Sequence, residues 1–186
     1  MKVLIALLLT VNLFGNVSPD YITTNYYDPS VVISFDSWKS ETLSVKIMSS
    51  ESEVILDDII NIKNTEGIKY NLKNLNSGKY IIKLENDVKM VEETVILFDG
   101  KIVEKDAVTY FKPTVSINDN FIKTSFLSYN GDVVVKIFNN EGLIFSDFAK
   151  NTKPYNKVYS ILALEQGVYT VKVSNDKVSK SLTFVK

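Results

Sequence analysis

The sequence predicts an all-β protein made of two tandem β-sandwich units that follow a signal peptide. Three observations lead to this prediction. Apolar and polar residues alternate with a period of two, as in half-buried strands. Clusters of Asn, Asp and Gly separate the apolar runs at the short intervals of a sandwich. A long motif also occurs twice at constant spacing, which predicts units at residues 19–107 and 108–186, each with six or seven strands.

The first residues have the pattern of a secretory signal peptide. Lys2 supplies the positive start, and residues 3–14 are mostly apolar. A core of this length is too short for a bilayer span, which takes about 20 residues. We therefore expect residues 1–18 to be removed on export, with Gly15 or Ser18 at the cleavage point, and no membrane segment to remain. The alternative is a buried first strand or helix.

A repeated motif ties the two units together. It runs from Tyr70 to Asp87 and returns from Tyr159 to Asp176, with Tyr, Leu, Gly, Tyr, Lys, Asn and Asp at the same spacing. Two shorter matches precede it, which pair residues 45–47 with 135–137 and residues 26–31 with 110–115. A repeat of this length predicts one fold for both halves.

Strands are expected wherever the period of two is clear. One face collects the apolar residues Leu43, Val45 and Ile47, then Tyr80, Ile82 and Leu84, and in the second copy Tyr169, Val171 and Val173. Asp99 and Gly100 stand between two apolar runs and indicate a two-residue hairpin. No long window has a helical stripe, although residues 57–63 could form a helical turn.

The repeated Leu-x-x-Gly-x-Tyr element has a structural explanation. In immunoglobulin-like sandwiches a Tyr near the start of the sixth strand donates its hydroxyl to the backbone of the preceding corner. We expect an immunoglobulin-like unit in which the leucines fill the core, the glycines turn the chain and the tyrosines make this bond. The expected structural residues are Leu75, Gly78, Tyr80, Leu164, Gly167 and Tyr169. The alternative is that the tyrosines stack on a ligand. Tyr70 and Tyr159, which precede the corners, are expected to contribute less to stability.

The composition excludes several kinds of chemistry. The chain has no Cys and no His, and all 21 basic residues are Lys. Thiol nucleophiles, imidazole bases, Cys/His metal sites and guanidinium clamps are therefore absent. A net charge of -1 gives no electrostatic reason for nucleic acid to bind. Without disulfides, stability must come from packing.

Carboxylates are the remaining candidates for catalysis or metal binding. The adjacent pairs at residues 57–58 and 92–93 would point to opposite faces of a strand, so neither pair can share a substrate. Calcium is the one cofactor that the composition allows, and residues 118–120 and 139–141 are oxygen-rich loops. Neither is a twelve-residue calcium loop, so we expect no catalytic residue, no metal and no cofactor.

Trp38 is the only Trp of the chain and stands in a polar stretch. If its ring is exposed, it is a candidate ligand contact that could stack on a sugar or a partner surface. The alternative is a residue that covers the end of the sandwich and needs no ligand.

The second half resembles a known family. Residues 135–142, the element from Leu164 to Val173 and the final Lys-containing strand are similar to the C-terminal sorting domain of cargo proteins of the type IX (Por) secretion system of Bacteroidetes. The whole chain resembles two-repeat secreted proteins of flavobacteria. The resemblance implies an immunoglobulin-like sandwich and an export signal. Sorting domains usually open with Asn-Pro, whereas this sequence has Lys112 and Pro113, and the same motif also occurs in the first unit.

Three functions remain. The favoured one is a non-catalytic exported β-sandwich protein that binds a surface glycan or protein. The alternative is a type IX cargo whose residues 108–186 form a sorting signal, with the secretion machinery as partner. A hydrolase is the third. All three place the protein outside the cytoplasm, in the medium, on the cell surface or in the periplasm.

Overall fold

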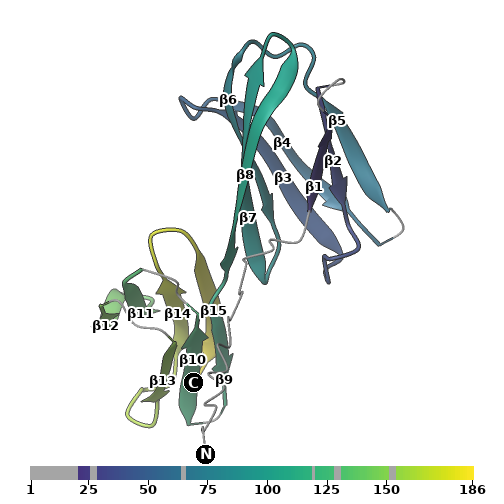
Figure 1. Ribbon diagram of the computed structural model, residues 1–186. Coiled ribbons are helices and arrows are strands. Elements are labelled where there is room, and N and C mark those ends of the chain that lie inside the picture. Colours follow the sequence, from purple (N-terminus) through teal and green to yellow (C-terminus); the bar gives the residue numbers. More distant parts are fainter. Residues whose placement is uncertain (1–20, 26–28, 64–65, 119, 128–130, 151–153) are drawn as a thin grey trace, which may run out of the picture.

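The computed structural model describes residues 21–25, 29–63, 66–118, 120–127, 131–150 and 154–186. The expected signal peptide, residues 1–18, lies outside them. The described residues form fifteen strands and no helix, so none of their elements is a helix that could cross a membrane. The predicted fold class is confirmed: the chain is all-β, with two immunoglobulin-like sandwiches in tandem (Figure 1).

The first sandwich packs a three-stranded sheet against a five-stranded one. The smaller sheet has the order β1-β2-β5, with β1 Ile22–Asn25, β2 Ser30–Ser34 and β5 Gly67–Asn71. The larger sheet has the order β4-β3-β6-β7-β8, with β4 Val54–Asn61, β3 Thr42–Ser49, β6 Gly78–Glu85, β7 Lys89–Phe98 and β8 Lys101–Phe111. All its strand pairs are antiparallel.

The second sandwich repeats this order with one strand fewer. Its three-stranded sheet is β13-β10-β9, with β13 Tyr155–Ser160, β10 Phe121–Phe126 and β9 Thr114–Ile117. Its four-stranded sheet is β12-β11-β14-β15, with β12 Gly142–Ala149, β11 Val133–Asn139, β14 Val168–Ser174 and β15 Ser179–Val185. The strand β8 therefore has no counterpart among the described residues of the second unit.

Strand register shows which residues of the two units are equivalent. Val45 pairs with Leu84 and Asp58, and Val135 pairs in the same way with Val173 and Asp147. The repeat from β3 to the turn after β6 therefore marks true structural counterparts.

The match of residues 26–31 with residues 110–115 does not join structural counterparts. Val31 on β2 pairs with Tyr70, while Tyr159 pairs with Ile122 on β10. The counterpart of Val31 is therefore Ile122, and Val115 lies one strand away on β9. Tyr26, Tyr27 and Asp28 of this match lie outside the described residues.

Each unit has its own core, formed by the predicted apolar faces. Leu43, Val45 and Ile47 of β3 are buried in the first core with Ile82 and Leu84 of β6. The second core contains the corresponding faces of β11 and β14, namely Val135, Ile137, Val171 and Val173. Because the intervening residues face outward, these strands have one buried and one solvated face.

The predicted hairpin at Asp99 is present. Asp99 and Gly100 both have a positive φ, 49° and 66°, as a type I′ turn requires. It returns the chain along β7 as β8, which gives the first unit eight strands instead of six or seven. The expected boundary after residue 107 falls inside β8, which runs on to Phe111.

The helical turn considered at residues 57–63 is wrong, because most of these residues belong to β4. β4 pairs with β3 from Thr42 to Met48, and its side chains alternate between exposed and half-buried. Ladder hydrogen bonds with a neighbouring strand override a weak local signal, as strand propensity depends on context.

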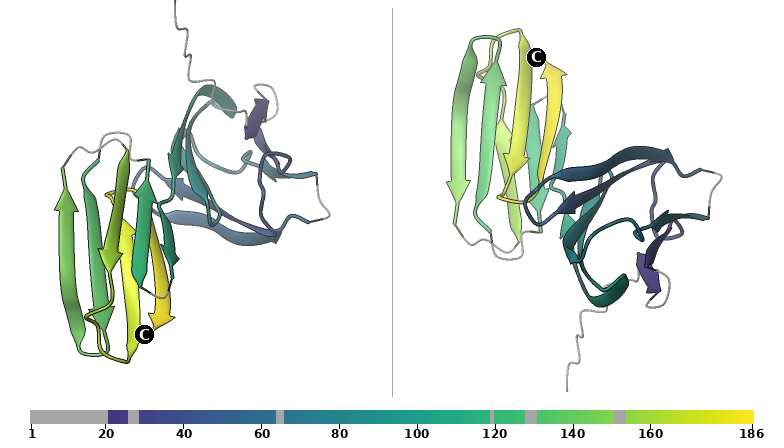
Figure 2. Two further views of the ribbon diagram at one scale, coloured as in Figure 1. Left: turned by 90° about the horizontal axis from the view of Figure 1, so that it is seen from below. Right: turned by 90° about the horizontal axis from the view of Figure 1, so that it is seen from above.

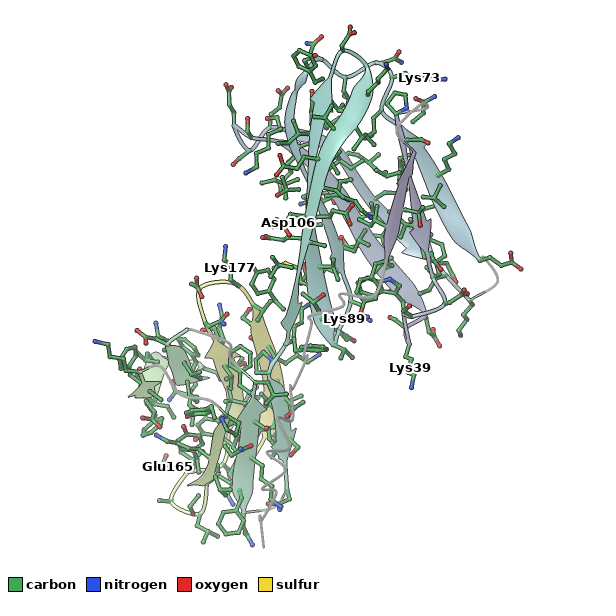
Figure 3. The ribbon with its side chains drawn as sticks, in the orientation of Figure 1. Lys39, Lys73, Lys89, Asp106, Glu165 and Lys177 are labelled. Carbon is green, nitrogen blue, oxygen red and sulfur yellow. The ribbon has the colours of Figure 1, made fainter. Side chains whose placement is uncertain are left out.

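The two units are joined by a contact around the turn between β6 and β7. Met90 of β7 is buried with the second core and not with the first. Lys112 forms an ion pair with Glu85, and Lys180 forms one with Asp87. The amino group of Lys177 lies over the Tyr110 ring, and Figure 3 shows Lys177 on the side of the second unit that faces the first.

Candidate functional site

Both tyrosines of the repeated element form the bond of a tyrosine corner. Tyr80 donates its hydroxyl to the carbonyl oxygen of Asn76 at 2.8 Å. Tyr169 donates to the carbonyl oxygen of Glu165 at 3.1 Å, again four residues upstream. Both tyrosines are buried, at 7% and 6% exposure, on the sixth strand of their units. Rings so placed have no face open to a stacking ligand.

The other residues of the corners surround these rings. Leu75 and Leu164 are half-buried and pack against the first and second core. Gly78 and Gly167 do not have a positive φ, so a left-handed turn does not explain them. A Cβ on Gly167 would meet the Tyr169 ring at 3.6 Å, which is an ordinary van der Waals distance. The expected role of these glycines in turning the chain is therefore not seen in the backbone.

Trp38 is not available as a ligand contact. Its side chain is 4% exposed, because it packs against Tyr21 at a ring distance of 5.3 Å and lies under Lys89. The amino group of Lys89 also lies 3.9 Å from the Tyr21 ring and donates to the Ser37 carbonyl oxygen. Figure 3 shows Lys89 at the end of the first unit nearer the second. The ring of Trp38 is therefore not exposed for a ligand. Its burial agrees with the alternative, a residue that covers the end of the sandwich.

The oxygen-rich loops use their side chains for turns. The Asn118 side-chain oxygen accepts hydrogen bonds from the backbone of Asn120 and Phe121. The Asn139 oxygen accepts in the same way from Glu141 and Gly142. Asp119 lies outside the described residues, and the described part of the chain contains no group of three acids, Cys or His that could hold a metal ion.

A polar cluster lies in the second unit at the opening between β12 and β13, and we call Asp147, Tyr155, Lys157 and Tyr159 the mouth cluster. Asp147 accepts hydrogen bonds from Lys157 at 2.6 Å and from the Tyr159 hydroxyl at 2.8 Å. The Tyr155 hydroxyl is hydrogen-bonded to that of Tyr159. Because the single proton of Tyr159 goes to Asp147, Tyr155 donates to Tyr159. The cluster closes the opening between the edges of the two sheets.

Hydrogen bonds and burial determine which groups of the mouth cluster carry a proton at neutral pH. The hydrogen bond from Lys157 lowers the pKa of Asp147, and the same bond raises the pKa of Lys157. Burial raises the pKa of Tyr159, and its hydrogen bond to the Asp147 carboxylate raises it further. Burial also raises the pKa of Tyr155. At neutral pH the cluster therefore holds one carboxylate, one ammonium and two neutral phenols.

The first unit has a reduced version of this cluster. Tyr70 lies 3.5 Å from Asp58 through its hydroxyl, and burial followed by the Asp58 charge raises the pKa of Tyr70 to about 12. Asp58 and Asp147 each stand twelve residues before the repeated tyrosine. This conserved spacing between the two copies is the signal by which the sequence could have revealed the pair. Nothing in the repeat indicates Tyr155 and Lys157, which only the second copy has.

The mouth cluster is not arranged for acid or base catalysis. A base at neutral pH needs a free lone pair on a group with a pKa near 7. Asp147 has a lowered pKa and already accepts two hydrogen bonds, while the tyrosines keep their protons. The cluster therefore acts as a fixed set of polar contacts that orders the opening of the sandwich.

Next to the mouth cluster, β12 exposes an apolar surface. Phe148 is 58% exposed and Leu143 is 52% exposed, and Ile144 and Phe145 follow at 43% and 41%. We call these four residues the β12 patch. It lies on the side of the second unit away from the first, as Figures 1 and 2 both show for β12.

The chain has low similarity to the known proteins that it matches over most of its length. No curated protein matches it in sequence. Among solved structures, a "Biofilm associated protein - BSP domain" is 13% identical, covers 85% of this chain and 27% of its own, and has a TM-score of 0.28. The FN1–FN3 domains of chicken CNTN1 are 11% identical, with 88% and 61% covered and a TM-score of 0.29. Scores of this size support no inference about function.

A family model gives the more specific result. The model described as "Secretion system C-terminal sorting domain" matches residues 28–98. The resemblance to this family is thereby confirmed, although the matched segment is the first unit, from just before β2 to the end of β7, and not the second. Residues 28–98 are thus similar to the sorting domain of a secretion system, and the second unit repeats the strands and the corner of that segment.

Proposed function

We propose that the protein is a non-catalytic β-sandwich protein that type IX secretion machinery carries out of the cell. The observation that supports this is the match of residues 28–98 to the sorting-domain family. The second unit has the same strand order from β9 to β15 and the same tyrosine corner. Both units thus share the strand order and the corner of the matched segment.

The absence of a catalytic role is part of the proposal. It is supported by the pKa directions in the mouth cluster, where the carboxylate is tied by Lys157 and Tyr159 and both phenols stay protonated. It is supported also by a composition without Cys and His. A screen of the purified protein with esterase, glycosidase and peptidase substrates should give no turnover.

Export can be tested in a host that has type IX secretion. The full chain, carrying a small epitope inserted between β10 and β11, is expressed in the wild-type strain and in a strain without the outer-membrane secretion pore. We expect the protein in the medium or on the surface of the first strain only. Equal amounts outside both strains would contradict type IX export.

The intact mass of the exported protein separates two versions of the proposal. If the mass includes both units, the second unit is a resident part of a surface or extracellular protein. If the mass corresponds to loss of residues beyond Phe111, the second unit is a sorting signal. The boundary follows from β8, which belongs to the first sheet up to Phe111.

A second candidate function is a surface binding module with a glycan or a protein as partner. The exposed apolar side chains of the β12 patch favour it, because apolar patches of a few hundred Å² on a soluble protein often mark an interaction site. A purified wild-type protein that binds cells of its own species, and loses this binding when Phe148 is changed to Lys, would support it.

A further inference from the structure

We propose that β12 is a self-association edge, through which a second copy of this chain pairs antiparallel to form a symmetric dimer. The proposal concerns assembly and does not depend on the export route. It rests on the β12 patch, on the charges of the edge strands and on a comparison between β12 and its counterpart β4 in the first unit.

Three other edge strands, β1, β8 and β9, have protection that β12 lacks. Edge strands normally carry charges or are very short, which prevents pairing with another chain. β1 and β9 are four residues each, and β8 carries Lys101, Glu104, Lys105 and Asp106. The only charge on β12 is Asp147, which faces the mouth cluster and is held by Lys157 and Tyr159.

The counterpart β4 shows what protects the same edge in the first unit. Both strands have the same irregular register near their start, at Ile47/Met48 in one and Ile137/Phe138 in the other. Both expose apolar side chains, with Ile59 at 74% in β4 where β12 has Phe148. The middle residue differs, because Asp57 stands where β12 has Ser146.

A register centred on this middle residue explains the difference. In an antiparallel pair of two β12 strands centred on Ser146, Phe148 of one copy lies opposite Ile144 of the other. Apolar cross-strand pairs of this kind stabilise a sheet. The same register for β4 would set Asp57 directly opposite Asp57, and like charges in that position are unfavourable. The ion pair of Asp57 with Lys46 at 2.8 Å reduces this repulsion, so the register is disfavoured for the first unit relative to the second.

The lysines behind the edge do not oppose the pairing. Lys136 lies opposite Ser146 on β11, one strand in from the edge. With strands about 4.8 Å apart, the two Lys136 side chains of a dimer would start about 14 Å from each other. This distance is longer than the Debye length of about 8 Å at physiological ionic strength, so their repulsion is largely screened.

The area of the patch suits a weak, specific dimer. A large apolar residue buries about 200 Å² when it is fully covered. From the exposed fractions of its four residues, the β12 patch offers roughly 400 Å² per copy, so a symmetric dimer would bury about 800 Å² in total. An interface of this size is typical of weak, transient association. The four-stranded sheets of two copies would join into one sheet across the twofold axis.

Sedimentation velocity of the full secreted chain, from about 1 to 300 μM, tests the proposal. We expect a concentration-dependent dimer for the wild type. Ser146→Asp, which introduces the residue of the first unit and sets like charges opposite each other at the axis, should raise the dissociation constant at least tenfold. Phe148→Lys, which removes the apolar pair with Ile144 of the other copy, should do the same. Ile59→Lys is the matched control in β4 and should leave the dimer unchanged.

Cross-linking checks the register in a chain that has no native Cys. Directly opposed residues of antiparallel strands have Cα atoms about 4.5 to 5.5 Å apart, which a disulfide can bridge. Ser146→Cys should therefore form a disulfide-linked dimer under mild oxidation, and Phe148→Cys, which lies opposite Ile144 in this register, should not. Because both positions are exposed, circular dichroism and Trp38 fluorescence should show the native fold in every variant.

Three results would each overturn the proposal. One is a wild-type chain that stays monomeric at 300 μM. Another is a dimer that Ser146→Asp does not weaken, since the interface would then lie elsewhere. The third is equal weakening by Ile59→Lys, or cross-linking of Phe148→Cys equal to that of Ser146→Cys, because the interface would then not be the β12 edge in this register.

Discussion

The tyrosine corners allow a sharp test because the two units contain the same bond in slightly different geometry. Tyr80→Phe and Tyr169→Phe each keep the buried ring and remove one hydroxyl, which donates to a carbonyl at 2.8 Å and 3.1 Å respectively. Both acceptors belong to exposed residues, Asn76 and Glu165, so water can replace the lost donor. The cost should therefore be that of an ordinary hydrogen bond, about 0.5 to 1.5 kcal/mol, with the larger value for Tyr80.

The tyrosines before the corners supply the comparison. Tyr70→Phe should cost less than Tyr80→Phe, because the Tyr70 hydroxyl reaches Asp58 only at 3.5 Å. In the second unit the order should reverse, against the expectation from sequence. Tyr159 donates to a carboxylate and accepts from Tyr155, and bonds to charged groups contribute about 1.5 to 3 kcal/mol.

Urea unfolding can separate the two units. Trp38, the only Trp of the chain, belongs to the first core, so its fluorescence follows that unit, while far-ultraviolet circular dichroism follows both. The costs of Tyr80→Phe and Tyr169→Phe should add within about 0.5 kcal/mol in the double variant, because the sites share no partner. Unchanged midpoints for both single variants, or a larger effect of Tyr70→Phe than of Tyr80→Phe, would refute this reasoning.

Three further predictions concern the joint, the mouth cluster and the absence of metal. Met90→Ala should destabilise the second unit by about 2 to 5 kcal/mol although Met90 lies on β7, because its side chain is buried in the second core; an effect on Trp38 fluorescence alone would contradict this. The raised pKa of Tyr159 means that its contribution is complete below the unfolded value of about 10 and is lost as the pH rises further. The urea midpoint should therefore fall less between pH 9 and 11 in Tyr159→Phe than in the wild type, and parallel curves would argue against it. Strong chelator and reductant should leave the circular dichroism spectrum unchanged, since the chain has no Cys and its described residues contain no acidic group of metal-binding size.

The sequence predicted those parts of the fold that depend on local pattern. The alternation of apolar and polar residues predicted the strands β3, β6 and β14. The Asp99–Gly100 pair predicted the β7–β8 hairpin, and the Leu-x-x-Gly-x-Tyr spacing predicted the tyrosine corners. Each of these is determined within about twenty residues of chain, so a single sequence contains enough information.

Features that depend on distant contacts were missed. The equivalence of Val31 with Ile122 follows from pairing with strands about forty residues away, and local similarity to Val115 was misleading. The polar stretch around Trp38 left its exposure open between two readings, because Tyr21 and Lys89, which bury it, are distant from it in sequence. The mouth cluster likewise depends on β12 and β13 meeting at the sandwich opening.

The short connection after β8 has a mechanical consequence. Only Lys112 and Pro113 separate β8 from β9, and β8 points along its own axis toward the second unit (Figure 1). Tension between the two units would therefore reach β8 without any slack in the chain. Because β8 is paired with β7 from Lys101 to Phe111, the pull would act along the strands and load the rungs of this ladder together, in shear. A protein held at one end outside the cell would resist drag through this ladder.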